Sequence, residues 1–510
     1  MADSTLDMKS LAIGQGRFDD ASFSGTEIQH VGKALLYICI LGAIVTLGIA
    51  SRNLLLVSLM LAFYVGMAIA VRNPLWSRTP WTFPQPIMML TLWWLFAFGI
   101  ASLPKFLGTT PIHWDLIGHE SYLYWALFNV MVANAVVIAG YFAVWPGIIP
   151  QEERRGEHSL LEGSLSLVFV VFFWALSLFA RGYLFGIGRF GYISDFSRPE
   201  SGFRQTFTYM YEFSWVAIAA LVVELMTTKD SSKKTRVVIL LSVISLVELL
   251  SVVVMGFKGF AILTYAPAIA AAWGLKRRLP YKALIAGALA VIIITPGNFL
   301  YRQDINAGLI ARDDFFTAAE TSVGYTFKGI ASDPIETVVY VWESVTAEFA
   351  DFLENTALIL YKTPSLVPHR GADWYFTALP RALFPRFVWK DKPADDMAAY
   401  MTVVYRGFKA TTGSPPGYVG ELYMRAGEGG VFLGSFVTGA LLGVFTRLFG
   451  KARKKKFALV AVASVMAASI SNTHLDSLIV YLVHRSIIYT AVAWLMFFEV
   501  RQPLADSTTD

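Results

Sequence analysis

The sequence is poor in charged residues and nearly lacks cysteine. Charged residues make up 15% of its 510 positions, whereas a typical soluble domain holds about 25%. Because Cys39 is the only cysteine, an intramolecular disulfide is excluded, and the redox compartment does not follow from the sequence. Hydrophobic residues make up 55% of the chain. This balance is typical of an integral membrane protein.

Nucleotide and zinc motifs are missing as well. No P-loop, dinucleotide fingerprint or HExxH pair occurs, so a nucleotide-driven pump or a zinc protease has no support. The stretch "PIHWDLIGHE" (111–120) holds two histidines and two carboxylates, which are suitable ligands for a divalent metal. Their spacing fits no particular site, and we interpret the stretch as a solvated loop. The chain is also expected to have no metal, no cofactor and no nucleic-acid partner.

Apolar runs of about 20 residues recur along the chain, and this is the length that crosses a ~30 Å hydrocarbon core. We predict an all-α polytopic membrane protein with about 12 transmembrane helices. The expected spans are 34–50, 53–71, 84–103, 121–145, 163–180, 206–228, 237–256, 259–275, 283–300, 430–446, 457–473 and 478–498. The chain thus divides into an N-terminal tail (1–33), spans one to nine (34–300), a large loop (301–429), spans ten to twelve (430–498) and a C-terminal tail (499–510).

The loop charges predict the orientation, because Lys and Arg gather in cytoplasmic loops. With a cytoplasmic N-terminus, the cytoplasmic loops hold more than twice as many Lys and Arg as the short loops opposite. Both termini are then cytoplasmic, and the 301–429 loop lies on the outer side. Its length indicates a functional element. Within it, residues 333–361 have helical apolar spacing, with Asp351 and Glu354 among the carboxylates on the other faces.

The segment "HRGADWYFTALPRALFPRFVWKDKP" (369–393) combines cations, aromatic residues and prolines inside the large loop. Its prolines forbid a continuous helix. Arginine binds phosphate oxygens bidentately, so the segment suits a lipid-linked pyrophosphate and its sugars. Snorkelling interfacial residues, with Trp374 and Trp389 in an aromatic belt, are the alternative. The sequel "GSPPGYVGELYMRAGEGGVFLGSFVTG" (413–439) is rich in glycine, which permits tight turns before span ten.

Two further groups of charged residues lie outside the large loop. The stretch 181–204 holds four arginines on the predicted outer side, against the charge bias. It is either a second phosphate clamp or a set of structural ion pairs with Asp195 and Glu200. His484 and Arg485 lie about two turns into span twelve, where charged residues usually mark function. The alternative there is buried pairing with Glu248 or Glu224.

The segments 371–393 and 413–443 together resemble the Wzy-type O-antigen or oligosaccharide repeat-unit polymerases of bacterial inner membranes. The similar elements are Gly371, Pro380-Arg381, Pro385, Lys392-Pro393, Gly420-Glu421-Leu422-Tyr423, Gly427 and Gly430. The likeness covers some 70 residues, and the rest agrees in topology. Motif matching carries over only Arg381, Lys392, Glu421 and Tyr423, and it does not place the family's catalytic base.

The resemblance implies a GT-C-like, metal-independent glycosyltransferase with one large periplasmic loop. Such an enzyme polymerises undecaprenyl-pyrophosphate-linked repeat units, which are both donor and acceptor, into O-antigen, capsule or exopolysaccharide. An O-antigen ligase and a lipid-linked oligosaccharide flippase remain alternatives, and binding of a chain-length regulator stays open. The implied location is the inner (cytoplasmic) membrane.

The chemistry of this reaction guides the choice of site residues. Cations stabilise the departing pyrophosphate, and a histidine or carboxylate accepts the proton of the acceptor hydroxyl. We expect His369, Glu421 and Arg381 to be catalytic. The predicted substrate-binding residues are Arg370, Arg386, Lys392, Tyr423, Arg189, Arg204, His484 and Arg485.

Overall fold

The computed structural model describes parts of the chain between residues 86 and 498. The described ranges are 86–106, 110–144, 163–187, 202–255, 258–276, 349–377, 397–408, 414–450, 455–470 and 475–498, with scattered positions in 320–333 and 380–391. Within these ranges the regular elements are helices and no β-strand occurs. This confirms the predicted all-α class for the described part of the chain.

Helices of very different length make up the described part of the chain. They are α3 (Pro86–Trp94), which continues through tighter and wider turns into α4 (Leu103–Phe106), α5 (Ser121–Val144), α6 (Leu167–Gly186), α7 (Gly202–Tyr211), α8 (Phe213–Thr227), α9 (Ser231–Met255), α10 (Lys258–Lys276), a helix over 349–362, α14 (Asp373–Phe376), α16 (Met397–Tyr400), α17 (Tyr418–Gly450), α18 (Lys456–Ile470) and α19 (Leu475–Met496).

Four described helical segments are long and apolar enough to cross a membrane. They are Ser121–Val144, Leu167–Gly186, Thr206–Thr227 and Tyr418–Thr446. Several shorter apolar helices accompany them, so the chain is a membrane protein by composition and by helix length. Nine of the expected spans coincide with described helices. The expected spans 34–50, 53–71 and 283–300 and both predicted tails lie outside the described residues, and the count of twelve stays a prediction.

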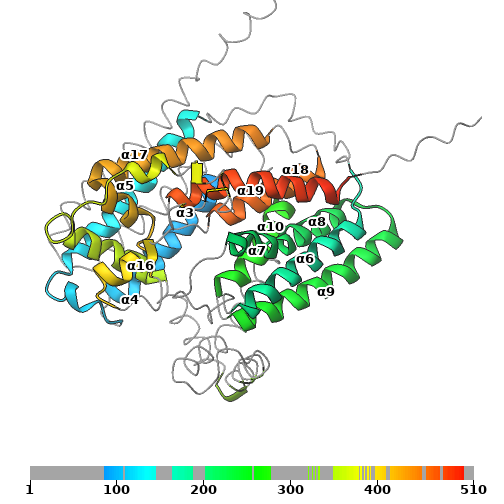
Figure 1. Cartoon of the computed structure of the whole chain (residues 1–510), viewed down its shortest axis with the longest axis horizontal. Helices are drawn as coiled ribbons and strands as arrows, with labels where there is room; N and C mark the ends of the chain where they lie inside the picture. Colours follow the sequence, from blue (N-terminus) through cyan, green and yellow to red (C-terminus); the bar gives the residue numbers. More distant parts are fainter. Residues whose placement is uncertain are drawn as a thin grey trace, which may run out of the picture.

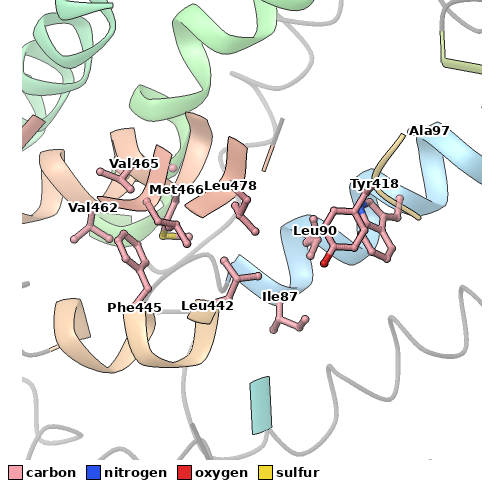
Figure 2. Packing of buried hydrophobic residues seen from close by; sticks show 14 of the residues in the cluster. Ile87, Leu90, Ala97, Tyr418, Leu442, Phe445, Val462, Val465, Met466 and Leu478 are labelled. Atoms are coloured by element: carbon pink, nitrogen blue, oxygen red, sulfur yellow. The ribbon is translucent and has the colours of Figure 1, made fainter. Parts of the chain in front are cut away.

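The helices form two groups joined by α18 and α19 (Figure 1). In one group α17 packs along α5 and also contacts α3; in the other α8 contacts α6, α9 and α10. Figure 2 shows the junction, where Leu442 and Phe445 of α17 point toward Val462 and Met466 of α18. All four side chains are buried. Burial of apolar side chains therefore joins the two groups.

Helix α17 is bent back on itself near its start. The backbone leaves helical geometry at Ala426 and Gly427, where Gly427 has φ +62°. The Tyr418 hydroxyl contacts the Thr438 hydroxyl and lies 3.2 Å from the Gly434 carbonyl oxygen, so the chain has reversed direction between them. A short arm (418–425) thus packs against a long arm (428–450). The expectation that span ten begins at residue 430 omitted this short arm.

Glycine permits the close contact between the arms, as well as that between α17 and α5. A Cβ atom at Gly430 would lie 2.5 Å from the Leu422 carbonyl oxygen. A Cβ at Gly439 would overlap the Val137 carbonyl and lie 2.7 Å from the Tyr141 nitrogen, and one at Gly140 would overlap the Phe436 carbonyl. Small residues let membrane helices approach until their backbones touch. The α5–α17 contact is of this kind.

We expect Gly439→Ala to destabilise the protein by about 1–3 kcal/mol, because overpacking a close contact costs this much. Gly429→Ala is the matched control, since nothing lies within 4 Å of a Cβ at that helical position. Thermal unfolding of the two purified variants in detergent measures the difference. Equal midpoints would contradict the backbone contact between α5 and α17.

Candidate functional site

The segment 369–371 is attached to the end of the short arm of α17. The Arg370 N–H donates to the Met424 carbonyl at 3.0 Å, and the Gly371 N–H donates to the Arg425 carbonyl at 3.1 Å. Carbonyls at a helix end have no partner within the helix, so an adjoining chain can bind them. Gly371 has φ +84°, which glycine adopts without strain. Two distant sequence segments thereby meet at the α17 bend.

His369 and Arg370 are held in defined positions at this junction. The exposed His369 ring has Nδ1 3.1 Å from the Tyr423 carbonyl oxygen and passes over Gly427. The Arg370 guanidinium lies 4.1 Å from the centre of the Tyr400 ring. Arginine over an aromatic face is stabilised by cation–π attraction.

Glu421 and Arg425 form an ion pair inside the short arm. Arg425 Nε lies 3.1 Å from Glu421 Oε1, and the two residues are one helical turn apart. Glu421 is fully buried and Arg425 nearly so. A buried carboxylate needs such a partner, because its desolvation is otherwise costly. In this conformation the Glu421 carboxylate is bound to Arg425 and does not face solvent.

A second set of polar residues, which we call the charged cluster, lies beside this junction. Its members are Lys105, His113, Asp115, Asp351, Glu354, Lys362 and Arg406. They come from α4 and the chain that follows it, the helix 349–362 and the chain after α16. Lys362 Nζ lies 2.6 Å from the Tyr405 carbonyl oxygen, and the Tyr405 ring packs against the ring of Tyr400. The charged cluster is thus connected to Arg370 through two tyrosines.

Each charge of the charged cluster faces an opposite charge. Lys105 Nζ contacts the Glu354 carboxylate and lies 3.7 Å from Asp351 Oδ1. Arg406 Nη1 lies 3.3 Å from Asp351 Oδ2. Lys362 Nζ lies 2.6 Å from Asp115 Oδ2. The positive charges of the three cations are therefore matched by the negative charges of the three carboxylates.

Burial shifts the pKa values of three groups in this region. It lowers the pKa of His113, whose Nδ1 accepts the Asp115 N–H at 3.3 Å and whose Nε2 lies 3.2 Å from the Arg406 carbonyl oxygen. The lowered pKa fits a neutral ring that accepts at Nδ1 and donates at Nε2. Burial likewise raises the pKa of Asp351 and raises that of Tyr405 to about 12.

Comparison with known proteins assigns the chain to a family but gives it no activity. The model of a domain of unknown function, DUF8712, matches residues 189–466, which is more than half of the chain. The chain belongs to the DUF8712 family. No curated protein and no solved structure matches it. The family description gives no activity, and its matched range covers the α17 bend and the helix 349–362 of this DUF8712 protein.

The structure describes only some of the remaining predicted site residues of the DUF8712 chain. Arg381 is buried, and its N–H donates to the Thr377 carbonyl at 2.9 Å. Tyr423 is half-buried on the short arm. Arg189, Arg386 and Lys392 lie outside the described residues, as do Asp195 and Glu200. Of Arg204 only the helical backbone within α7 is described.

Arg485 and His484 lie on α19, where they face the helix group that contains α8. Arg485 Nε lies 2.7 Å from Glu212 Oε2, and the guanidinium contacts the second carboxylate oxygen as well. The His484 ring packs edge-on against Tyr209. Buried pairing of Arg485 was one of the two expectations, but the expected partners were wrong. Glu248 pairs with Arg181, and Glu224 pairs with Lys233 and Lys456.

Sequence reasoning overlooked most of the charged cluster. The interpretation of residues 111–120 as a solvated loop is wrong at His113, which is 5% exposed. Glu354 was placed on a polar face, yet it is 1% exposed because Lys105 and the His113 N–H bind its carboxylate. The sequence did hold a signal for this cluster: Asp351 and Glu354 are two carboxylates three residues apart on a mostly apolar helix. Among the residues described, no group of three or more His, Cys, Asp or Glu side chains could hold a metal ion.

We expect Glu354→Gln to destabilise the protein by about 3–5 kcal/mol, because it leaves Lys105 buried with a weakened partner. The double variant Lys105→Met/Glu354→Leu removes both charges and should recover much of this loss. Chemical unfolding in detergent measures both free energies. If Glu354→Gln unfolds like the wild type, the buried pair has no structural role.

Proposed function

We propose that this DUF8712 protein is a membrane glycosyltransferase that polymerises undecaprenyl-pyrophosphate-linked oligosaccharide repeat units on the periplasmic face of a bacterial inner membrane. One observation carries the proposal. The segment 369–371 and the short arm of α17, which hold Gly371 and Gly420–Tyr423 of the Wzy-like resemblance, are joined by backbone hydrogen bonds. A cation, a histidine and a tyrosine therefore adjoin each other at one end of an apolar helix.

The cations of this site suit the pyrophosphate of the donor. As the glycosidic bond to pyrophosphate breaks, negative charge grows on the departing oxygen, and a preorganised cation lowers the barrier. Arg370 is preorganised, because Met424 holds its backbone and Tyr400 supports its guanidinium. In the proposed mechanism Arg370 binds the pyrophosphate, with Arg381, Arg386 and Lys392 as further cations of the same segment.

Geometry favours His369 over Glu421 as the base. His369 is exposed, and with its Nδ1–H donated to the Tyr423 carbonyl, Nε2 is left as the proton acceptor. Glu421 is buried and already paired. In the proposed step the acceptor hydroxyl oxygen attacks the anomeric carbon, and its proton passes to Nε2. The bond from that carbon to the pyrophosphate oxygen breaks, and the electron pair leaves with the pyrophosphate.

The outer surface of α17 suits the lipid part of the substrate. Phe432, Leu433 and Phe436 follow the bend on the long arm, and they are 60%, 65% and 38% exposed. Apolar surface of this kind is stable against lipid but not against water. A polyprenyl chain could lie along this surface while its pyrophosphate reaches Arg370. Because the donor sugar is carried by a lipid, the proposed reaction needs no nucleotide sugar and no cytoplasmic domain to bind one.

We expect Arg370→Ala to lower the rate of polymerisation by about 10²–10³-fold, the usual effect of removing one stabilising group from a transition state. Tyr400 offers a matched pair: Tyr400→Phe keeps an aromatic face for the guanidinium, whereas Tyr400→Leu removes it. The leucine variant should be several-fold slower than the phenylalanine variant. The assay follows chain growth by purified protein supplied with lipid-linked repeat units.

Two outcomes would contradict the assignment. Wild-type chain growth by a folded Arg370→Ala variant would remove Arg370 from the site. Transfer of glycan only to lipid A core, without chain growth, would indicate a ligase instead. Thermal unfolding of each variant separates loss of chemistry from loss of folding.

A further inference from the structure

Two basic segments more than 200 residues apart converge at one buried carboxylate. Glu224, at the end of α8, is 2% exposed. Lys233 Nζ lies 2.6 Å from its Oε1, and Lys456 Nζ lies 2.8 Å from its Oε2. Lys233 belongs to the start of α9 and Lys456 to the start of α18. The loop charges predict both segments on the cytoplasmic side, and this ion triad places them side by side.

Exposed cations surround the triad. We call the group of Lys229, Lys234, Arg236 and Lys455 the basic patch, and all four are exposed. Each lies within five residues of a triad lysine in the sequence. Asp230 is the carboxylate of the same segment, and its side chain accepts the Ser232 N–H at the start of α9 at 2.9 Å. The surface thus carries an excess of positive charge beside helix ends.

An exposed apolar stripe begins next to the basic patch. Ile239, Val243, Leu246 and Leu250 recur at helical spacing along α9 and are 59%, 46%, 59% and 52% exposed. The stripe starts three residues after Arg236. Cations at a helix end followed by an apolar face match the two parts of a phospholipid, with its phosphate at the head and its acyl chains along the helix.

We propose that the basic patch binds the headgroup of an anionic phospholipid, whose acyl chains lie along the stripe on α9. Charge complementarity selects the headgroup, because an anionic lipid attracts clustered Lys and Arg near the membrane surface. The Glu224 triad fixes the distance between the two segments and so builds the patch. This inference is independent of the proposed transferase activity.

Lipid retention by the purified full-length protein tests the proposal. Native mass spectrometry would compare phosphatidylglycerol with phosphatidylcholine of the same acyl chains. The neutral variant replaces Lys229, Lys234, Arg236 and Lys455 by Gln, and the matched control exchanges Lys for Arg and Arg for Lys at the same positions. The ion triad around the buried Glu224 stays intact in both, which protects the fold.

We expect the wild type and the charge-preserving control to retain phosphatidylglycerol at least tenfold better than phosphatidylcholine, and the neutral variant to lose this preference. Equal retention of the two lipids by the wild type would overturn the proposal. So would an undiminished preference in the neutral variant. Displacement of the lipid by millimolar inorganic phosphate would also overturn it, because the site would then recognise free phosphate.

Discussion

The reversal of α17 at Ala426 and Gly427 is the constraint on which the rest of the site depends. Because the chain turns back there, the end of the short arm presents its last carbonyls to the segment 369–371. Glycines at 430 and 439 let the long arm lie against the short arm and against α5. Without the reversal, His369 and Arg370 would have no fixed place beside Tyr423.

Charge pairing explains how buried polar groups are tolerated near this bend and in the helix group that contains α8. In the charged cluster, and in the pairs Glu421–Arg425 and Glu212–Arg485, each buried carboxylate meets a cation. Pairing offsets much of the desolvation cost, although such pairs add little net stability. Their clearer effect is to fix which segments meet. The cluster joins the helix 349–362 to the chain on either side, and the Glu224 triad joins α8, α9 and α18.

Much of the helical layout could be predicted from the sequence, because apolar runs of membrane length carry their own signal. The C-terminal ends of α5 and α8 fall within one residue of expectation. The short arm of α17 could not be predicted, because residues 418–425 fit within a loop by composition. The pairing of Lys105 with Glu354 could not be predicted either, because two residues 249 positions apart in the sequence leave no local pattern. The choice of His369, Arg370 and Glu421 as site residues stays a prediction, and it came from the close recurrence of basic, aromatic and glycine residues in these two segments.

The central claim is that this protein joins lipid-linked repeat units into long chains. The most direct measurement is the glycan profile of a host strain from which the gene has been deleted, together with the lipid carrier on which the glycan accumulates. The account predicts that the ladder of chain lengths collapses to one repeat unit on undecaprenyl pyrophosphate at the periplasmic face. Long chains left on the carrier, or single units held in the cytoplasm, would contradict it.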